Sequence, residues 1–436
     1  MTRILGGSAL IAALAILGLA MTGPNAPAQR NPFSWYAESV DYLRHPAEVS
    51  PQSRWYSLAE LGLAENAAQE DFEVGTPPSD GNSGIVDLSD FSCPPRLQQL
   101  WDREILTRTE AWEGGIETGR DAVGFPSVVQ NIHGKSPDGK FYLFYAIHDP
   151  YAGIALAVAD KIDGPFRKLH EISRFRPDSR VLRAPKRPRK TSHFSSPVVH
   201  WNPAEQKWFL YFHFYANEWD KGGGHQRTAL AVTDSLSSHS WTPWTDSEGR
   251  LIAVLPTTSE RWMNSQSSYH SIHRLRNGHW LAFLRGVGGE YDSNGEWQQD
   301  VGKLGFAISP DGRRWAELGP NPVIHADDGR NGRKGVYRPY FVARLADSFL
   351  LGWGESEFYD AEPRLILGTS RDLRHVSTTA APQPVLSPAD GAMSLWRRED
   401  TLYAFYGARQ RAWKLIDDCP RARNRSHPRF LRKNRY

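Results

Sequence analysis

Several features that would point to a particular chemistry are missing from this chain of 436 residues. It has no Gly-x-Ser-x-Gly elbow and no glycine-rich phosphate loop, so nothing supports a serine nucleophile of that kind or nucleotide binding. After Met21, no apolar run approaches the roughly 20 residues that a bilayer span requires. We therefore expect no membrane span beyond the N-terminal segment.

Cysteine is scarce as well. The sequence contains only Cys93 and Cys419, which flank the repeats described below. A bridge between them would close a very long loop and restrict the unfolded chain. The alternative is a pair of unpaired, buried thiols.

The N-terminal segment has the parts of an export signal. Arg3 supplies positive charge, Ala9–Met21 forms an apolar run, and Ala26 to Ala28 offer a small-x-small cleavage site. An uncleaved membrane anchor is the alternative, but the run is shorter than about 20 residues. We expect a signal peptide at residues 1–28 and a secreted or periplasmic protein that does not meet nucleic acid.

The main feature that is present is a repeated unit. Each copy has an aromatic-rich strand, a loop, a second strand that ends in a small-residue turn, and a further aromatic residue. The aromatic strands are Phe141–Tyr145, Trp208–Phe212, Trp280–Leu284 and Phe349–Trp353, with an incomplete fifth copy at Thr401–Tyr406. A period of about 60–75 residues built from short strands predicts an all-β fold, a five-bladed β-propeller with one copy per blade.

Each copy is preceded by a segment that would form the inner strand of its blade. These segments are Pro126–Gln130, Pro197–Trp201, Ser271–Leu275, Pro339–Ala343 and Ala392–Trp396. The fifth blade lacks an outer strand after residue 416, so we expect Glu104–Trp112 to complete it. The predicted organisation is a signal peptide (1–28), an irregular N-terminal arm (29–100), the propeller (101–420) and a basic tail (421–436).

Positive charge is concentrated in two segments, although the net charge is only +3. Arg174–Lys190 holds eight Arg or Lys and one Asp, and the tail from Arg421 holds seven and no acid. Such runs are either solvated surface or sites that attract an anionic polymer or envelope.

Acidic and aromatic residues recur in the loops after the second strands. The three loops are Asn217–Asp220, Gly289–Asp292 and Glu357–Asp360. Because successive strands are antiparallel, these loops and the starts of the inner strands lie on one face of the propeller. Paired carboxylates are what glycosidic cleavage requires, with aromatic rings to stack on sugars. The alternatives are polar loops with an anchoring aromatic residue, or calcium ligands.

Histidines gather in the second and third copies. They are His193, His200, His213, His225, His270 and His273. Because none has a spacing typical of a zinc site, we interpret them as polar lining of the channel rather than as metal ligands.

Three sequence segments carry a family resemblance: Ser196–Asn202, Leu304–Gly312 and Leu367–Leu373. With the five copies, they resemble the five-bladed propeller glycoside hydrolases of the arabinanase/xylosidase and invertase/levansucrase kind, over about residues 120–416. The resemblance implies carboxylates at the starts of the first three inner strands. The matching places hold Gly124–Pro126, Ser195–Pro197 and Tyr269–Ser271 here, with Asp121 three residues before the first.

The sequence thus predicts an exported glycoside hydrolase that acts on a polysaccharide or oligosaccharide by carboxylate acid/base catalysis. The alternative is a non-catalytic glycan-binding or envelope scaffold propeller. The expected partner is a carbohydrate, in particular an anionic glycan, and no cofactor is expected beyond a structural calcium ion. The predicted catalytic residues are Asp121, Glu290 and Glu357, and the predicted substrate-binding residues are His270, Arg338, Trp219 and Tyr291.

Overall fold

The structure is a computed structural model, and it describes most of the chain after residue 44. The described ranges are 45–72, 85–91, 93–113, 123–147, 153–173, 176–184, 194–215, 226–295, 297–300, 302–325, 335–356, 364–378 and 393–417. Within these ranges, no helix combines the length and the apolar character needed to cross a bilayer. The predicted signal peptide and the basic tail lie outside them.

Blades one to three each consist of an antiparallel sheet whose strands follow one another in sequence. Blade one contains β4 (Gly124–Gln130), β5 (Phe141–Ala146), β6 (Gly153–Ala159) and β7 (Arg167–Lys168), followed by α2 (Leu169–Ile172) and by β8 (Arg180–Arg183), which pairs with β6. Blade two contains β9 (Phe194–Asn202), β10 (Lys207–Tyr215), β11 (Gln226–Thr233) and β12 (Thr242–Pro243), with β14 (Ala253–Leu255) added to β11. Blade three contains β15 (Gln266–Arg274), β16 (Trp280–Val287), β19 (Lys303–Ser309) and β20 (Ala316–Glu317). A separate hairpin between β16 and β19 consists of β17 (Gly289–Tyr291) and β18 (Trp297–Gln299).

Blades four and five each include a strand from the N-terminal part of the chain. Blade four contains β21 (Gly335–Arg344), β22 (Phe349–Ser356), β23 (Arg364–Ser370) and β24 (Ser377–Thr378), with β2 (Val86–Asp87) parallel to β21. Blade five contains β25 (Met393–Arg398), β26 (Thr401–Tyr406), β27 (Arg409–Ile416) and β3 (Arg96–Glu104).

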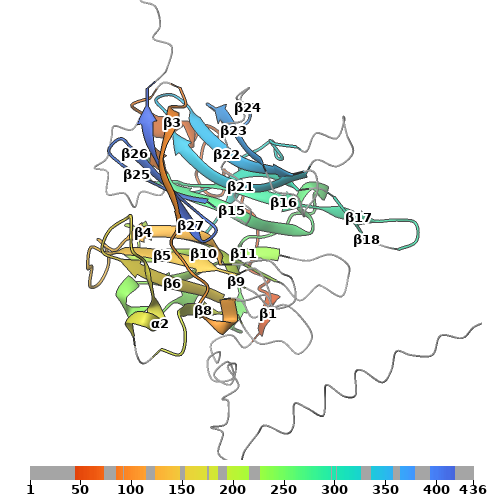
Figure 1. Ribbon diagram of the computed structural model, residues 1–436. Coiled ribbons are helices and arrows are strands. Elements are labelled where there is room, and N and C mark those ends of the chain that lie inside the picture. Colours follow the sequence, from red (N-terminus) through yellow and green to blue (C-terminus); the bar gives the residue numbers. More distant parts are fainter. Residues whose placement is uncertain are drawn as a thin grey trace, which may run out of the picture. The chain divides into compact units, whose positions relative to one another are not determined.

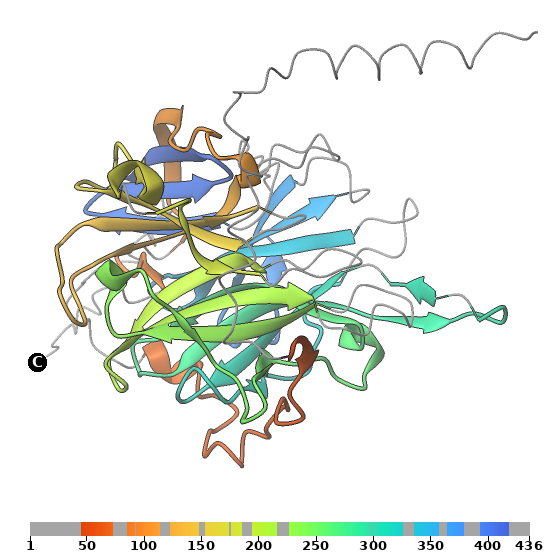
Figure 2. The ribbon, with the colours of Figure 1, turned by 90° about the horizontal axis from the view of Figure 1, so that it is seen from below.

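The five sheets form a closed ring around one axis. The inner strands β4, β9, β15, β21 and β25 contact one another in that order, and β25 contacts β4. The strands are labelled in Figure 1, and Figure 2 shows the sheets gathered about the centre. The five-bladed propeller predicted from the repeats is therefore confirmed.

The sequence placed the strand that completes blade five too late. The strand that pairs with β27 is β3, Arg96–Glu104, rather than Glu104–Trp112. It is an outer strand with many exposed side chains, so it lacks the apolar pattern of the inner strands. Closure by a segment from the other end of the propeller is nevertheless what the sequence predicted.

The first three strands of the blades read as apolar runs because neighbouring blades cover both of their faces. Every residue of β5 is buried, and so is every residue of β16. The side chains of Trp208, Phe283 and Trp353 are buried, as the repeats predicted.

The N-terminal arm contacts blades two and three first. Strand β1 (His45–Val49) runs parallel to β13 (Arg250–Leu251), and the Trp55 indole donates a hydrogen bond to the Pro256 carbonyl at 3.0 Å. The backbone amide of Tyr56 then donates to the Trp315 carbonyl at 2.9 Å. The arm therefore passes from blade two to blade three.

Ion pairs then bind the arm to blades three, four and five. A short 3-10 helix, Gln69–Phe72, supplies the buried Asp71, which pairs with Arg344 of β21 at 3.1 Å. Further pairs join Asp87 to Arg276, and Asp90 to Arg397 at 2.6 Å. Before it enters β3 the chain passes Cys93, which is disulfide-bonded; Cys419, the other cysteine of the sequence, lies outside the described residues.

Candidate functional site

Three of the predicted site residues cannot be placed. Asp121, Trp219 and Glu357 lie outside the described residues. The structure does place Glu290 and Tyr291 on β17, and His270 and Arg338 on the inner strands β15 and β21.

The hairpin of β17 and β18 carries Glu290 and Tyr291 away from the inner strands. Asn264 attaches it to blade three, because its side-chain amide donates to the Gly289 carbonyl and accepts from the Gly289 amide, both at 3.0 Å. Glu290 and Tyr291 are exposed, Tyr291 by 53%. Figures 1 and 2 show this hairpin extending beyond the sheet of blade three. The two residues therefore lie on an exposed hairpin rather than among the buried strand ends.

His270 is buried between blades two and three. Its Nδ1 atom lies 3.0 Å from the hydroxyl of Thr228 on β11, and that hydroxyl donates to the Ser267 carbonyl at 2.9 Å. Burial lowers the pKa of His270 to about 3, so the imidazole is neutral at physiological pH. The ring joins two blades and carries no charge for a ligand.

Three inner strands have a strained residue at the end where they begin. Phe125, Ser196 and Tyr269 have φ values of 54°, 51° and 54°, in the left-handed region that non-glycine residues rarely adopt. At these places the pairing with the second strand slips by one residue, as it does beside Arg338 in β21. Each such conformation costs about 1–3 kcal/mol and is characteristic of functional sites. We call this end of the central channel the mouth.

Five side chains from blades one to four form a cluster at the mouth: Phe125, His213, Tyr269, Arg285 and Arg338. The Phe125 and Tyr269 rings are stacked with centroids 6.1 Å apart, and the His213 ring lies edge-on to Tyr269 at 4.8 Å. The guanidinium carbons of Arg285 and Arg338 lie 4.3 and 4.1 Å from the Tyr269 centroid. We refer to these residues as the mouth cluster.

The mouth cluster combines two cations with aromatic faces in a nearly dry environment. Tyr269, Arg285 and Arg338 are 5%, 4% and 5% exposed. Charges interact more strongly at such sites than in bulk water. The cluster therefore combines apolar faces with polar groups, as ligand sites do, but its five side chains include no carboxylate for acid/base chemistry.

One described carboxylate does lie at the end of a second strand on this side of the propeller. Glu355 is half-buried near the end of β22, opposite Val336 of β21, and its Oε1 accepts a hydrogen bond from the Trp353 indole at 3.1 Å. Among the residues that the structure describes, no group of three His, Cys, Asp or Glu side chains could hold a metal ion.

The channel contains a cavity of about 50 Å³ that all five inner strands line. Polar side chains connect the inner strands around it. The hydrogen bonds join Ser127 to Val199, His200 to Ile272, Ser271 to Tyr340 and Ser394 to Val128, at 3.0, 2.5, 3.2 and 3.2 Å. His200, His270 and His273 line this cavity, as predicted, and His213 belongs to the mouth cluster. His193 and His225 lie outside the described residues.

The sequence pointed to Arg338 as a site residue. It marked Phe125 and Tyr269 only as parts of the segments where the resembling hydrolases carry acids, it marked His213 only as channel lining, and it did not point to Arg285. One signal was available for Arg285, since it is the lone charge in the apolar run Trp280–Val287. Another was the recurrence of proline directly after Phe125, Ser196 and Arg338, at the starts of three inner strands.

Comparisons with known proteins found similar solved structures but no match in sequence. No protein-family model matches the chain, and no curated protein matches it in sequence. Among solved structures, it resembles a thermostable family-43 glycoside hydrolase (TM-score 0.42, 11% identity, 67% of this chain and 88% of that one). It also resembles a β-xylosidase, RS223 (0.44, 11%, 67% and 92%), and an N-acetylgalactosamine deacetylase from F. plautii, in complex with blood group B trisaccharide (0.46, 13%, 71% and 85%). The architecture of a five-bladed propeller rests on the sheets themselves, and we draw no functional conclusion from similarities this low.

Proposed function

We propose that this protein binds a glycan at the channel mouth and cleaves a glycosidic bond in it. The mouth cluster is the observation that supports this proposal. Ligand sites are lined by apolar and aromatic side chains with a few convergent polar groups, and this cluster has that composition. Tyr269 and Phe125 supply the aromatic faces, and Arg285 and Arg338 are the polar groups beside them.

Hydrolysis needs two carboxyl groups, one protonated to donate to the leaving oxygen and one ionised to attack or to activate water. We assign these roles to acids in the loops after the second strands and before the first inner strand, which we call the rim acids. Asp121, Glu290 and Glu357 remain the proposed catalytic residues. Glu355 is an additional candidate, because it is half-buried at the end of a second strand.

We further propose that the protein works outside the cytoplasm, in the periplasm or the medium. The signal-like N-terminus supports this localisation, and the disulfide bond at Cys93 is consistent with an oxidising compartment.

A non-catalytic glycan-binding propeller is the second candidate. It is favoured by the inner strands, since the three places where the resembling hydrolases carry acids hold Gly124–Pro126, Ser195–Pro197 and Tyr269–Ser271. In this alternative, the protein would bind a sugar at the mouth without cleaving it.

A hydrolysis screen on polysaccharides with the full mature chain tests both candidates. The variants Asp121→Asn, Glu357→Gln, Glu355→Gln and Glu290→Gln remove one charge each and keep the shape. Glu104→Gln, on the exposed outer strand of blade five, is the matched control. We expect at least one rim variant to lose two or more orders of magnitude in kcat while its binding persists. Glycan binding without turnover by the unmodified protein would establish the second candidate, and the absence of any glycan binding would refute both.

A further inference from the structure

We propose that a second cavity, between blades four and five, is a binding site for one small, uncharged, apolar molecule. The cavity has a volume of about 160 Å³, and no residue of the mouth cluster lines it. Apolar cavities of roughly 150 Å³ stay dry and bind benzene or xenon, so this volume is sufficient for one such ligand. The inference does not depend on the proposed glycan site.

The wall of the cavity selects an apolar ligand. Blades four and five supply mostly leucines, together with Phe341, Ala343 and Trp413, and the N-terminal arm supplies Pro94 and its neighbours. Among the described lining residues, Gln99 has the only polar side chain and none is charged. A water molecule in a cavity needs two to four polar partners, and a charged ligand would lose its hydration without gaining an ion pair. An uncharged hydrocarbon loses nothing of this kind.

One source of the space is Ala343 on the inner strand of blade four. Ala343 pairs with the second residue of the repeated aromatic segment, and the residue at this place in blades two and three is His200 and His273. These histidines bond to the inner strand of the next blade, at the Ile272 carbonyl (2.5 Å) and the Val342 amide (3.3 Å). Because alanine has no side chain that could reach blade five in this way, the corresponding space stays open.

The other source is Gly352 on the second strand of blade four. At the fourth place of the same segment, blades one to three carry an aromatic ring: Phe144, Tyr211 and Phe283. A Cβ at Gly352 would overlap the ring of Phe341, so this ring takes the vacant place and becomes part of the wall. Two large side chains of the repeat are thus replaced by small ones at this seam, whereas protein interiors in general contain few spaces larger than a water molecule.

The cavity approaches the surface beside β3. Pro94 and Leu97 are half-buried and Gln99 is exposed, whereas Ala343 on the opposite wall is fully buried. The outer wall therefore consists of the arm and of β3, which are not part of the repeats. A ligand can enter by displacing this wall, without separating the inner strands that close the ring.

The first test measures thermal unfolding of the full mature chain with benzene, and with benzoate at the same concentrations. A ligand that binds only the folded state raises the Tm progressively with its concentration. We expect benzene to do so up to its limit of solubility, and benzoate to leave the Tm unchanged. No rise with benzene would overturn the proposal, and an equal rise with both would overturn the choice of an uncharged ligand.

Substitutions that fill the cavity locate the bound benzene. Ala343→Leu adds carbon atoms from the side of blade four and should weaken benzene binding at least about tenfold. Leu402→Phe fills the same space from blade five and serves if the first variant does not fold. The matched control is Leu351→Ile, a change at nearly constant volume in the seam between blades three and four, which should bind benzene as the unmodified protein does. Unchanged affinity in the filled variants would overturn the proposal.

Enlarging the cavity should change the preferred size of the ligand. Leu350→Ala removes part of the wall, so the affinity for butylbenzene relative to benzene should rise at least about fivefold. A loss of packing alone would not move this ratio, and an unchanged ratio would contradict binding in this cavity. A crystal of the unmodified protein under xenon decides the location directly, because xenon bound only elsewhere would overturn the assignment.

Discussion

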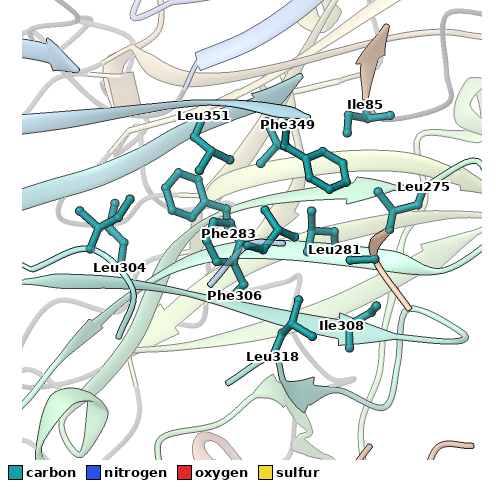
Figure 3. Packing of buried hydrophobic residues seen from close by; sticks show 14 of the residues in the cluster. Ile85, Leu275, Leu281, Phe283, Leu304, Phe306, Ile308, Leu318, Phe349 and Leu351 are labelled. Carbon is teal, nitrogen blue, oxygen red and sulfur yellow. The ribbon is translucent and has the colours of Figure 1, made fainter. Parts of the chain in front are cut away.

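The seam between blades three and four is filled, whereas the seam between blades four and five contains a cavity. At the first seam, Phe283 and Phe306 stack with centroids 4.8 Å apart beside Trp353. Figure 3 shows how these phenylalanines pack with Leu304, Phe349 and other buried residues of this cluster. The second seam encloses about 160 Å³, lined mostly by leucine and by residues of the N-terminal arm.

The two seams differ in the size of their side chains and in the segments of the chain that line them. Gly368 leaves room for the Trp353 indole in the filled seam, since a Cβ there would come within 2.9 Å of the ring. The seam between blades four and five, which we call the open seam, is lined by the smaller Ala343, Leu365 and Leu402. Pro94 and Leu97 of the arm form part of the cavity wall. Where the repeats place aromatic side chains at a seam, the two blades fill that seam by themselves. Where they do not, a segment outside the repeats completes the seam.

Two adjacent leucines of β22 give the sharpest test of this comparison. Leu351 is buried in the filled seam and Leu350 lines the cavity. Leu→Ala costs about 2–5 kcal/mol, and the cost rises with the contacts that are lost. We expect Leu351→Ala to lower the free energy of unfolding by about 4 kcal/mol and Leu350→Ala by about 2 kcal/mol, measured by urea denaturation. Equal losses would show that the two seams are packed alike.

The disulfide bond at Cys93 should matter most on the side of the open seam. Cys93 lies three residues before β3, which completes blade five. Cys93→Ser should reduce the stability by about 2–4 kcal/mol, because the unfolded chain is no longer restricted. Hydrogen exchange should accelerate in β3 and β27 before it does in β16 and β22. A uniform acceleration across all blades would contradict this local role, and a reductant should affect only the unmodified protein.

The sequence predicted the architecture because every blade repeats the same pattern of strands. The aromatic second strands and the inner strands before them occur where the structure has them, since both faces of these strands are buried. The closing strand was misplaced because Arg96–Glu104 is an exposed outer strand without an apolar pattern. The grouping of the mouth cluster could not be predicted, for a different reason. Tyr269 and Arg285 come together through a bulge, a feature of backbone register that residue types do not reveal.

Acid should weaken the polar seam between blades two and three rather than the leucine seam. Burial lowers the pKa of His200 from its usual 6.5 to about 3, and the ring donates to the Ile272 carbonyl. Between these values the unfolded state binds a proton that the folded state does not, so stability falls as the pH decreases from about 6.5, by up to about 1.4 kcal/mol per pH unit. Above pH 6.5 this contribution is constant.

The variant His200→Gln, which keeps an N–H donor, isolates this effect in urea denaturation between pH 7.5 and 5. The raised pKa of Glu317, about 7, acts in the opposite direction, so the difference between the two proteins is the informative quantity. We expect the slope of stability against pH to be smaller in His200→Gln, while Leu350→Ala should parallel the unmodified protein. Identical slopes in all three would exclude His200 as the sensitive group.

The smallest expected effect is a gain in stability, from filling the cavity. Ala343 and Leu351 are both fully buried, but Ala343 lines the cavity whereas Leu351 belongs to the filled seam. Ala343→Val adds methyl groups where space exists and should raise the free energy of unfolding by about 0.5–1.5 kcal/mol. Leu351→Phe enlarges a side chain that packed residues surround and should lower it by about 1–3 kcal/mol. If the denaturation midpoints of both variants shifted in the same direction, the two seams would not differ in free space. The contrast between them would then be one of side-chain size alone.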